Sequence, residues 1–400
     1  MKVIWLGDAG CHTGFGRVTH AIGERLVRDY GHDIHVLAVN YDGDHVDTNL
    51  KLYVPTKLVG HDLYGQSRFV EMLGTVEPDV VVMLNDPYVV AKFLFRNNWD
   101  KDRILLQYRP ILAYMPVDGT NQPTEWDVVK KVTQPVVMAE YGHTWIPEAP
   151  LALHGVDSDT FRPVSEKPLK TSTGKVIRSK KEAKRALGYD PDGFLVVRVD
   201  RNSRRKDFGA TFKALVPVMK RHPDIQVHFH CKWSGDDGVE LPPLLSREPD
   251  LAKRFFQPGN HDTRKGWPEE DLAVLYNAAD LVVSTSWGEG FGLTNLEAIS
   301  CGTPVIAQNV SSITEVVGPG GVLIDPMDTI TVTSGEDQWL PDIPAFSEAI
   351  EHLYTAGGTR KKLGEAGRQH ALKFRWDDAA RVFDEQIRLL ASPTENGEQS

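Results

Sequence analysis

The segment Trp287–Ser300, WGEGFGLTNLEAIS, joins a glycine-rich turn to the start of an expected helix. Its pattern predicts a helix that begins near Phe291 or Gly292, directly after a buried strand. The first turn of a helix presents backbone N–H groups and the positive end of the helix dipole, which suits an anion such as a diphosphate. Gly290 and Gly292 have no side chain, so the backbone can approach such a ligand closely.

Two glutamates in this segment could hold different parts of one ligand. Glu289 lies in the turn, and Glu297 lies about two helical turns further on. The spacing allows Glu289 to bind hydroxyls of a sugar while Glu297 binds ribose hydroxyls, with each charge-assisted hydrogen bond contributing about 1.5 to 3 kcal/mol. The segment therefore predicts a nucleotide-sugar site, and the simpler alternative is a glycine-rich turn with two solvated glutamates.

The elements around this segment form two series of short apolar strands and helical patterns. Continuous Val, Ile and Leu runs between helices indicate parallel strands that are covered on both faces. In the first half the strands are expected at residues 2–6, 33–39, 79–85, 111–115 and 135–139, with a helix at 14–27. In the second half we expect strands at 194–200, 225–230, 280–285, 304–307 and 321–325, and helices at 208–221, 269–279, 290–300, 343–355 and 359–373. The segment Asp328–Pro341 is expected to be a polar surface excursion.

A chain of 400 residues is long enough for two domains, because single cores rarely grow beyond about 250 to 300 residues. A Lys-, Ser- and Thr-rich stretch after residue 163 indicates the boundary. We expect an α/β fold with two Rossmann-like, doubly wound domains at residues 1–165 and 166–375, which face each other across a cleft. A helix at 376–391 is expected to return toward the first domain, and residues 392–400 to be a disordered tail.

Composition excludes several other classes of protein. No apolar run approaches the roughly 20 residues that span a bilayer, and the first residues lack the features of a signal peptide, so a soluble, cytoplasmic protein is expected. Cys11, Cys231 and Cys301 are widely separated, which disfavours a disulfide framework or a zinc ribbon. The net charge of -10 gives no general attraction to nucleic acid.

The motifs EEDLAVLYNAAD and GEGFGLTNLEAISCGTPVIA resemble those of family 4 of the retaining glycosyltransferases, which has the GT-B fold. The resemblance extends more loosely over nearly the whole chain. In VDRNSRRKDF, Arg201 and Lys206 match an Arg and a Lys of the family. The resemblance implies that they hold the diphosphate and offset its charge as it leaves, and that Glu297 binds the ribose. It also implies that the helix start at Gly292, Leu293 and Thr294 binds the diphosphate. A solvated basic loop or a nucleic-acid patch is the alternative for these cations.

The first half of the chain carries three further matches to the family, one of them altered. The loop GCHTGFGRVTH resembles the glycine-rich first loop of the family, in which Gly14 and Gly16 would close on the phosphates or on the transferred sugar. LHGVDSDTFRP resembles the hinge segment, and we expect a structural role for His154. Many members carry a histidine near the transferred sugar where this chain has YMPVDGT, which makes Asp118 a candidate active-site residue, or alternatively a capping residue of a turn.

Other residues mimic metal sites. Asp-x-Asp sequences occur at residues 42–44, 157–159 and 190–192, and metal-dependent glycosyltransferases use such a pair to hold a cation. We nevertheless expect no required metal, since Arg201 and Lys206 would supply positive charge. His228 and His230 alternate along one strand without a third nearby ligand, so a packed strand is expected.

The resemblance implies transfer of a hexose from a UDP- or GDP-sugar to an acceptor hydroxyl, without a further cofactor and with retention of configuration. The departing phosphate would help to deprotonate the acceptor, which could be a glycan, a small molecule, a protein or a modified nucleobase. The oligomeric state stays open. Two alternatives are a nucleotide-sugar epimerase on the same framework and a nucleotide-sugar or nucleic-acid binding protein without turnover.

Overall fold

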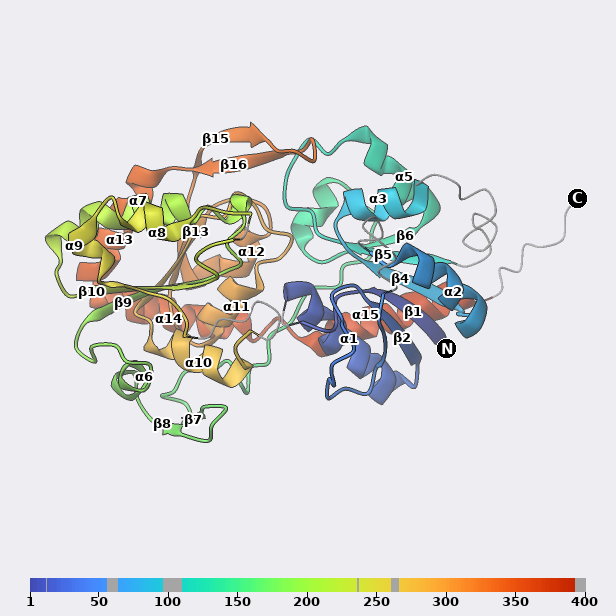
Figure 1. Ribbon diagram of the computed structural model, residues 1–400, viewed down its shortest axis with the longest axis horizontal. Coiled ribbons are helices and arrows are strands. Elements are labelled where there is room, and N and C mark those ends of the chain that lie inside the picture. The colour runs from blue at the N-terminus through green and yellow to red at the C-terminus, as the bar shows by residue number, and fades with distance from the viewer. Residues whose placement is uncertain (12, 56–63, 96–109, 236, 260–265, 393–400) are drawn as a thin grey trace, which may run out of the picture. The chain divides into compact units, whose positions relative to one another are not determined.

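The computed structural model describes residues 1–11, 13–55, 64–95, 110–235, 237–259 and 266–392 (Figure 1). These residues form two compact units. The first contains residues 1–117 and 121–155 together with the chain from Arg375 onward, and the second contains Asp118–Thr120 and Val156–Phe374. The expected disordered tail at residues 392–400 lies outside the described residues, apart from Ser392, which follows the last helix.

The first unit is built on a parallel six-stranded sheet with the order β3-β2-β1-β4-β5-β6. The order reverses between β1 and β4, which is the arrangement of a doubly wound sheet. The strands are β1 (Lys2–Gly7), β2 (Asp33–Ala38), β3 (Lys51–Tyr53), β4 (Val80–Leu84), β5 (Ile111–Met115) and β6 (Gln134–Val137).

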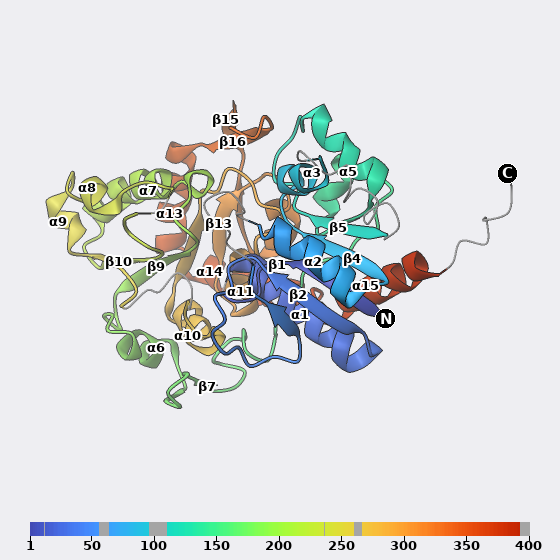
Figure 2. The same cartoon turned by 45° about the vertical axis from the view of Figure 1, so that its right-hand side comes forward.

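Helices cover both faces of this sheet (Figures 1 and 2). On one face, α2 (Gln66–Val76), α3 (Pro87–Phe95) and α5 (Asp127–Val132) contribute apolar side chains to a core with β1 and β4. On the other face lie α1 (Gly14–Tyr30) and α15 (Trp376–Ala391). Phe383 of α15 stacks on Trp5 of β1 with ring centroids 5.3 Å apart, so the last helix belongs to this unit. Short 3-10 helices occur at Thr124–Trp126 and Glu140–Thr144.

The second unit repeats the same topology with the strand order β11-β10-β9-β12-β13-β14. Its order reverses between β9 and β12, whose residues Val196 and Leu281 are register partners. The strands are β9 (Phe194–Val199), β10 (Ile225–His230), β11 (Phe255–Phe256), β12 (Leu281–Ser284), β13 (Val305–Gln308) and β14 (Gly321–Ile324).

Helices again cover both faces of the second sheet (Figure 2). α7 (Phe208–Arg221), α8 (Leu241–Leu245), α9 (Pro249–Ala252) and α13 (Ile343–Thr355) share one hydrophobic core with the strands. The remaining helices are α6 (Lys180–Ala186), α10 (Glu269–Ala278), α11 (Leu293–Ser300), α12 (Ile313–Val317) and α14 (Gly357–Ala371), with 3-10 helices at Arg204–Lys206 and Gly318–Gly320. The expected strands and helices of both halves are therefore present, whereas several shorter elements were not predicted, namely β3, β11, α2, α3, α5, α8, α9 and α12.

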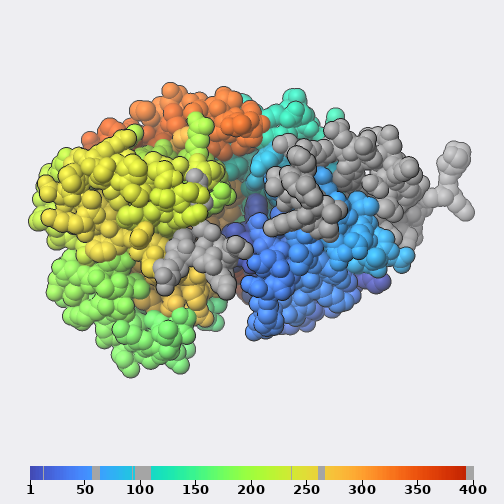
Figure 3. All heavy atoms as spheres, viewed as in Figure 1, coloured from blue at the N-terminus to red at the C-terminus, as the bar shows by residue number. Residues whose placement is uncertain are grey.

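Two regions that were expected to be irregular contain antiparallel hairpins. The excursion after residue 325 forms β15 (Pro326–Thr331) and β16 (Asp337–Pro341), and the stretch before α6 forms β7 (Leu169–Lys170) and β8 (Val176–Ile177). In the Thr-Ile-Thr end of β15, half-buried Ile330 lies between two exposed threonines, which suits a strand with one exposed face. Met327 of β15 is 66% exposed, and the orange β15–β16 hairpin lies at the surface (Figure 3).

The hinge motif from Val156 onward, and Glu166 just after it, contact the second unit. Val156 N–H donates to Phe374 O at 3.2 Å, and Ser300 Oγ donates to Phe161 O at 2.6 Å. Arg368 pairs with Glu166 at 2.9 Å. These contacts explain why the second unit begins at Val156, before the expected boundary at residues 165 and 166. Within the described parts of the chain, no helix combines the length and the apolar character that crossing a membrane requires.

Candidate functional site

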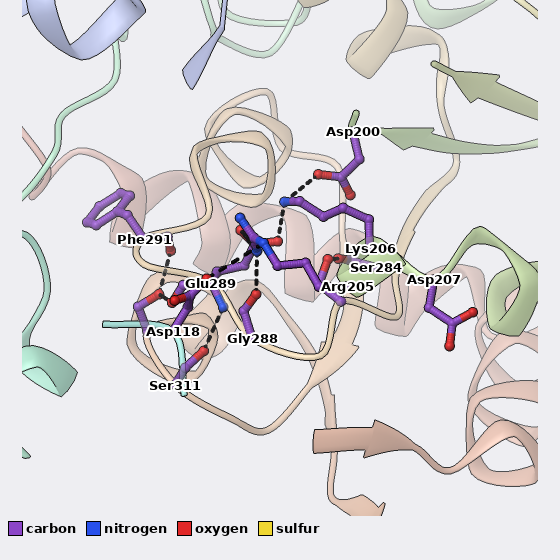
Figure 4. A network of polar contacts seen from close by, with 12 residues as sticks. Asp118, Asp200, Arg205, Lys206, Asp207, Ser284, Gly288, Glu289, Phe291 and Ser311 are labelled. Carbon is purple, nitrogen blue, oxygen red and sulfur yellow. Dashed lines mark hydrogen bonds and ion pairs between the residues drawn. The ribbon is translucent and has the colours of Figure 1, made fainter. Parts of the chain in front are cut away.

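Glu289 lies at the centre of an ion-pair network in the second unit (Figure 4). It follows β12 in the turn before α11, and only 6% of the residue is exposed. Lys206 Nζ donates to Glu289 Oε1, and Arg205 Nη1 donates to Glu289 Oε2 at 3.1 Å. Each carboxylate oxygen therefore has its own cationic partner, which compensates the cost of burying the charge.

Lys206 joins Glu289 to a second carboxylate. Its Nζ lies 2.8 Å from Asp200 Oδ1, and its side chain is only 12% exposed. Asp200 directly follows β9, whereas Glu289 follows β12 by a few residues. Because β9 and β12 are parallel neighbours at the point where the strand order reverses, the loops after them meet at one edge of the sheet. The topology thus brings together residues that are far apart in the sequence.

The surroundings of Glu289 keep its carboxylate ionised. Burial by itself raises the pKa of this group, but the charges of Lys206 and Arg205 act in the opposite direction. Hydrogen bonds from Lys206 and from the Ser286 hydroxyl add to their effect, and the pKa falls to about 2. Glu289 is therefore an anion with a fixed orientation at neutral pH.

The loop that carries Lys206 is held by hydrogen bonds from a buried arginine. Arg198 of β9 is 1% exposed and donates to the backbone oxygens of Lys206 and Asp207. Its guanidinium also donates to Thr285 Oγ1 at 2.7 Å, just before the Glu289 turn. Asp207 caps α7 and accepts a hydrogen bond from Trp287 Nε1 at 3.0 Å. These contacts fasten the loops after β9 and β12 to each other.

Two serines hold the Glu289 turn from its other side. Glu289 N–H donates to Ser311 Oγ at 3.0 Å (Figure 4). Ser312 Oγ donates to Glu289 O at 2.7 Å and to Phe291 O at 2.9 Å. The turn is thus fixed at three backbone atoms, so the Glu289 side chain projects from a rigid support.

Asp118 belongs to the same network. Its Oδ2 lies 3.6 Å from Arg205 Nε, and its side chain is 14% exposed. The segment 118–120 is part of the second unit, where Thr120 and Asp337 of β16 exchange two backbone hydrogen bonds of 2.8 Å each. A Cβ on Gly288 would lie 1.8 Å from Asp118 O, so only glycine allows this approach.

The start of α11 has the geometry that the glycine pattern predicted. The helix begins at Leu293, and its N-cap Gly292 has a φ of 95°, a conformation that favours glycine. Gly290 and the side chain of Phe291 are buried, with the Phe291 ring 5.8 Å from that of Phe374. Leu293 and Thr294 form the half-buried first turn of the helix. Backbone N–H groups in such a first turn have no carbonyl partner within the helix.

Two predicted site residues lie outside the network around Glu289. Glu297 is 2% exposed and accepts a hydrogen bond of 3.1 Å from the Tyr276 hydroxyl. The side chain of Arg201 is 69% exposed and pairs with Asp237 at 2.9 Å. Of the predicted residues, the structure therefore joins Lys206 and Glu289 directly and Asp118 to Glu289 through Arg205, and it leaves Arg201 at the surface.

The predicted glycines of the first loop lie in the first unit. Thr13 caps α1 and accepts a hydrogen bond from Gly16 N–H at 3.0 Å. A Cβ on Gly16 would lie 2.2 Å from Cys11 O, whereas one on Gly14 would meet nothing within 4 Å. Gly16 is therefore required by the packing of the loop itself, while Gly14 is exposed at the start of α1.

The residues that resembled other kinds of site have local partners. His154 is buried against the rings of Tyr114 and Trp376, and burial lowers its pKa to about 3. His228 and His230 are buried on β10, with a ring nitrogen of each 3.2 Å apart. In each of the three Asp-x-Asp sequences the first aspartate accepts a hydrogen bond from the backbone N–H two residues later, as in an Asx turn.

Four members of the network were not predicted from the sequence: Asp200, Arg205, Ser311 and Ser312. Asp200 had a usable signal, since it is the first charged residue after a buried strand that leads into the basic loop. Arg205 had none, because three arginines occur within residues 201–205 and the sequence does not say which of them turns inward.

Comparison with known proteins places this geometry in context. Residues 179–370, which contain Lys206, Glu289 and Glu297, match the model of the family described as Glycosyl transferases group 1. The chain is 28% identical over 251 residues to a D-inositol 3-phosphate glycosyltransferase of Corynebacterium urealyticum, an alignment that covers 61% of this chain and 51% of that protein. It is 47% identical over 150 residues to the O-antigen chain mannosyltransferase B of Escherichia coli, covering 36% of this chain and 35% of the relative. The aligned regions thus span about half of the first relative and about a third of the second.

Solved structures of other proteins match the fold over nearly the whole length of this chain. A structure of Anabaena Alr3699/HepE in complex with UDP and glucose aligns with a TM-score of 0.64 at 16% identity. The alignment covers 98% of this chain and 100% of that one. Two Rossmann-like sheets of this order, together with this match, give the GT-B fold, as predicted.

Proposed function

We propose that the chain is a retaining glycosyltransferase, since residues 179–370 match the model of the family described as Glycosyl transferases group 1. It would transfer a hexose from a nucleoside diphosphate sugar to a hydroxyl of an acceptor. The observation that carries this proposal is the buried, ionised Glu289 beside Lys206 at the carboxyl ends of β9 and β12. Ligands of doubly wound sheets bind at this kind of switch point.

We propose that Lys206 and the first turn of α11 hold the diphosphate. A lysine ammonium has three N–H donors, and the contacts of Lys206 within the described residues use two of them, to Asp200 and Glu289. The third can be directed at a phosphate oxygen. The helix start at Gly292, Leu293 and Thr294 supplies backbone N–H groups and the positive end of its dipole. Both features stabilise negative charge as the diphosphate departs.

We assign the two glutamates to the two sugars of the donor. Glu289 would orient hydroxyls of the transferred hexose, since an ionised carboxylate accepts two hydrogen bonds in a fixed direction. Glu297 would bind the ribose hydroxyls, in place of or beside its hydrogen bond from Tyr276. Arg201 would reach the diphosphate by leaving Asp237, an exchange that costs little because both side chains are more than half exposed.

The first unit would supply Gly14 and Gly16 toward the donor and most of the acceptor contacts. Asp118 would approach the transferred sugar. The acceptor hydroxyl would attack on the face from which the diphosphate leaves, and the departing phosphate would take its proton. We propose a UDP- or GDP-sugar as donor, no required metal, and a glycan, small molecule, protein or modified nucleobase as acceptor. The UDP and glucose bound to the Anabaena protein support this class of donor.

A screen for ligand-induced stabilisation tests the donor assignment. Nucleoside diphosphates and their sugars, with and without EDTA, should raise the melting temperature in proportion to occupancy. The best donor should then be hydrolysed slowly, or its hexose transferred with retention to a supplied acceptor. Donor that is epimerised and not transferred would contradict the proposal, and so would activity that EDTA abolishes and manganese restores.

The variant Glu289→Gln tests the role of the central acid. It keeps the shape of the side chain and removes its charge, so transfer should fall by about 100-fold while the affinity for the free nucleoside diphosphate changes little. Glu365→Gln, an exposed glutamate on α14, serves as the control. Equal losses in transfer and in diphosphate affinity would indicate that Glu289 only maintains the structure.

A further inference from the structure

We propose that Arg205 is a positioning residue for the transfer reaction, holding the carboxylates of Glu289 and Asp118 in one arrangement through a single guanidinium. This inference rests on the proposed glycosyl transfer and adds a residue to it. Arg201 and Lys206 match cationic positions of the family motif, whereas Arg205 stands out only in the structure (Figure 4).

The contacts of Arg205 surround the Glu289 turn. Nη1 donates to Gly288 O at 2.6 Å and to Glu289 Oε2 at 3.1 Å, and Nε lies 3.6 Å from Asp118 Oδ2. The backbone oxygen of Arg205 also accepts a hydrogen bond from Trp287 N–H at 2.8 Å. One residue therefore holds three successive residues of the turn and faces a second acid on another segment.

This set of contacts suits an arginine and no other cation. The guanidinium is a rigid planar fork with five N–H donors, so it can serve two carboxylates and a carbonyl in different directions. The ammonium of Lys206, by contrast, acts as a point charge between Asp200 and Glu289. The two cations have different contacts. Lys206 is 12% exposed and joins the loops after β9 and β12, while Arg205 is 35% exposed and faces Asp118.

The backbone of Asp118 is fixed without Arg205. Thr120 pairs with Asp337 of β16, and the carbonyl of Asp118 packs on Gly288, where there is no room for a Cβ. Within Asp118, the Arg205 side chain therefore orients the carboxylate and not the backbone. Removing the guanidinium should leave the segment in place and free the two acids to turn, which separates positioning from folding.

Arg205 also affects the protonation of Glu289. The charged groups that contact Glu289 are Lys206 and Arg205, and the hydroxyl of Ser286 donates to it. Beyond these cations stand two further acids, Asp200 at Lys206 and Asp118 at Arg205. Loss of Arg205 would leave three acids around one lysine, so the pKa of Glu289 should rise from its low value.

The experiment compares Arg205→Ala with Arg204→Ala in the full chain. Both changes remove one positive charge from the same 3-10 turn, but Arg204 is exposed and the structure gives its side chain none of the contacts described for Arg205. Arg205→Ala should lower kcat by about 10- to 100-fold and move the acid limb of the kcat profile to higher pH. The Kd for UDP or GDP, measured by calorimetry, should change by less than about threefold. Arg204→Ala should change kcat and the Kd for UDP or GDP by less than about twofold, and it should leave the acid limb of the kcat profile at the wild-type pH.

Two further variants sharpen the result. Arg205→Lys keeps the charge but not the fork, so it should restore the acid limb without restoring kcat. Asp118→Asn should lower kcat, and the double variant with Arg205→Ala should lose no more than the larger single loss, because the two residues act as one unit. Losses that multiply would overturn the inference. A Kd for the diphosphate that rises in parallel with the loss of kcat would identify Arg205 as a phosphate ligand instead.

A separate measurement keeps this inference distinct from the proposed function. Failure of the wild-type chain to turn over any nucleoside diphosphate sugar would overturn the proposed function. The link between Arg205 and Glu289 is then judged by acid unfolding alone. Arg205→Ala should unfold at higher pH than Arg204→Ala, and identical acid transitions for the two variants would refute the link.

Discussion

The two sheets share one topology but differ in the charge at the end of the central strand. In the first unit, Asp8 after β1 accepts hydrogen bonds from the neutral side chains of Thr13 and Asn40, at 2.7 and 2.6 Å. In the second unit, the equivalent position after β9 is Asp200, which binds the ammonium of Lys206. A shared strand order thus creates two similar edges, and the side chains after each strand decide which edge carries a buried cation.

The largest effect should come from removing the cation that makes the second edge distinct. In Lys206→Ala, Asp200 and Glu289 would face the diphosphate without the ammonium, so kcat should fall by about 10²- to 10³-fold at equal folded fraction. Lys220→Ala, which removes a lysine from an exposed pair with Glu248, is the control. Near-normal turnover of Lys206→Ala would remove the main difference between the two edges.

Substitution of Gly288 and of Gly14 by alanine tests whether close backbone contact at each position contributes to stability. Gly288→Ala would place a Cβ 1.8 Å from Asp118 O, so the free energy of unfolding should fall by about 1 to 3 kcal/mol. Gly14→Ala has open space around its Cβ at the start of α1 and should be neutral or slightly stabilising. Urea unfolding of both variants checks this, and similar stabilities would show that segment 118–120 is not held as described.

One buried titratable group in each unit, His154 in the first and Glu289 in the second, should lose its contribution to the free energy of unfolding in a different pH range. His154 has a pKa of about 3 against 6.5 when unfolded, so its neutral burial stabilises the fold fully above pH 6.5, and this stability is lost as the pH falls toward 3. Glu289 has a pKa of about 2 against 4.5, so its contribution is complete above pH 4.5 and is lost toward pH 2. Each group changes the unfolding free energy by at most about 1.4 kcal/mol per pH unit.

Two variants separate these ranges. His154→Phe should flatten the stability profile between pH 6.5 and 4.5, and Glu289→Gln should flatten it only below 4.5. Denaturant unfolding at intervals of half a pH unit measures both profiles. If Glu289→Gln altered the pH dependence of the unfolding free energy between pH 6.5 and 4.5, the network would not hold the carboxylate ionised.

The smallest effect concerns the second acid of the motif. Glu297→Ala should raise the Kd for the nucleotide sugar by about tenfold, since about 1.4 kcal/mol of hydrogen bonding to the ribose is lost. Tyr276→Phe removes only the present partner of Glu297 and should change this Kd by much less. Equal affinities of Glu297→Ala and the wild-type chain in calorimetry would remove Glu297 from the donor site.

Elements with a strong apolar period were predictable. All ten expected strands are present within a few residues, because continuous Val, Ile and Leu runs are typical of parallel strands buried on both faces. α2 and α3 were missed, although both contribute to the core of the first unit. The turn and polar residues of Asp328–Pro341 predict a surface excursion, and the structure forms the β15–β16 hairpin there.

The sequence alone determined the fold class and the glycine-rich turn with its two acids. These features depend on local pattern: apolar period, the φ that Gly292 needs, and the spacing of Glu289 and Glu297. Only the tertiary structure decided which charges meet. The neighbouring positions of β9 and β12 bring Asp200, Lys206 and Glu289 together, and the local turn directs Arg205 inward while Arg201 points to solvent. The direction of a side chain depends on backbone geometry and packing across the fold, which residue order along the chain does not express.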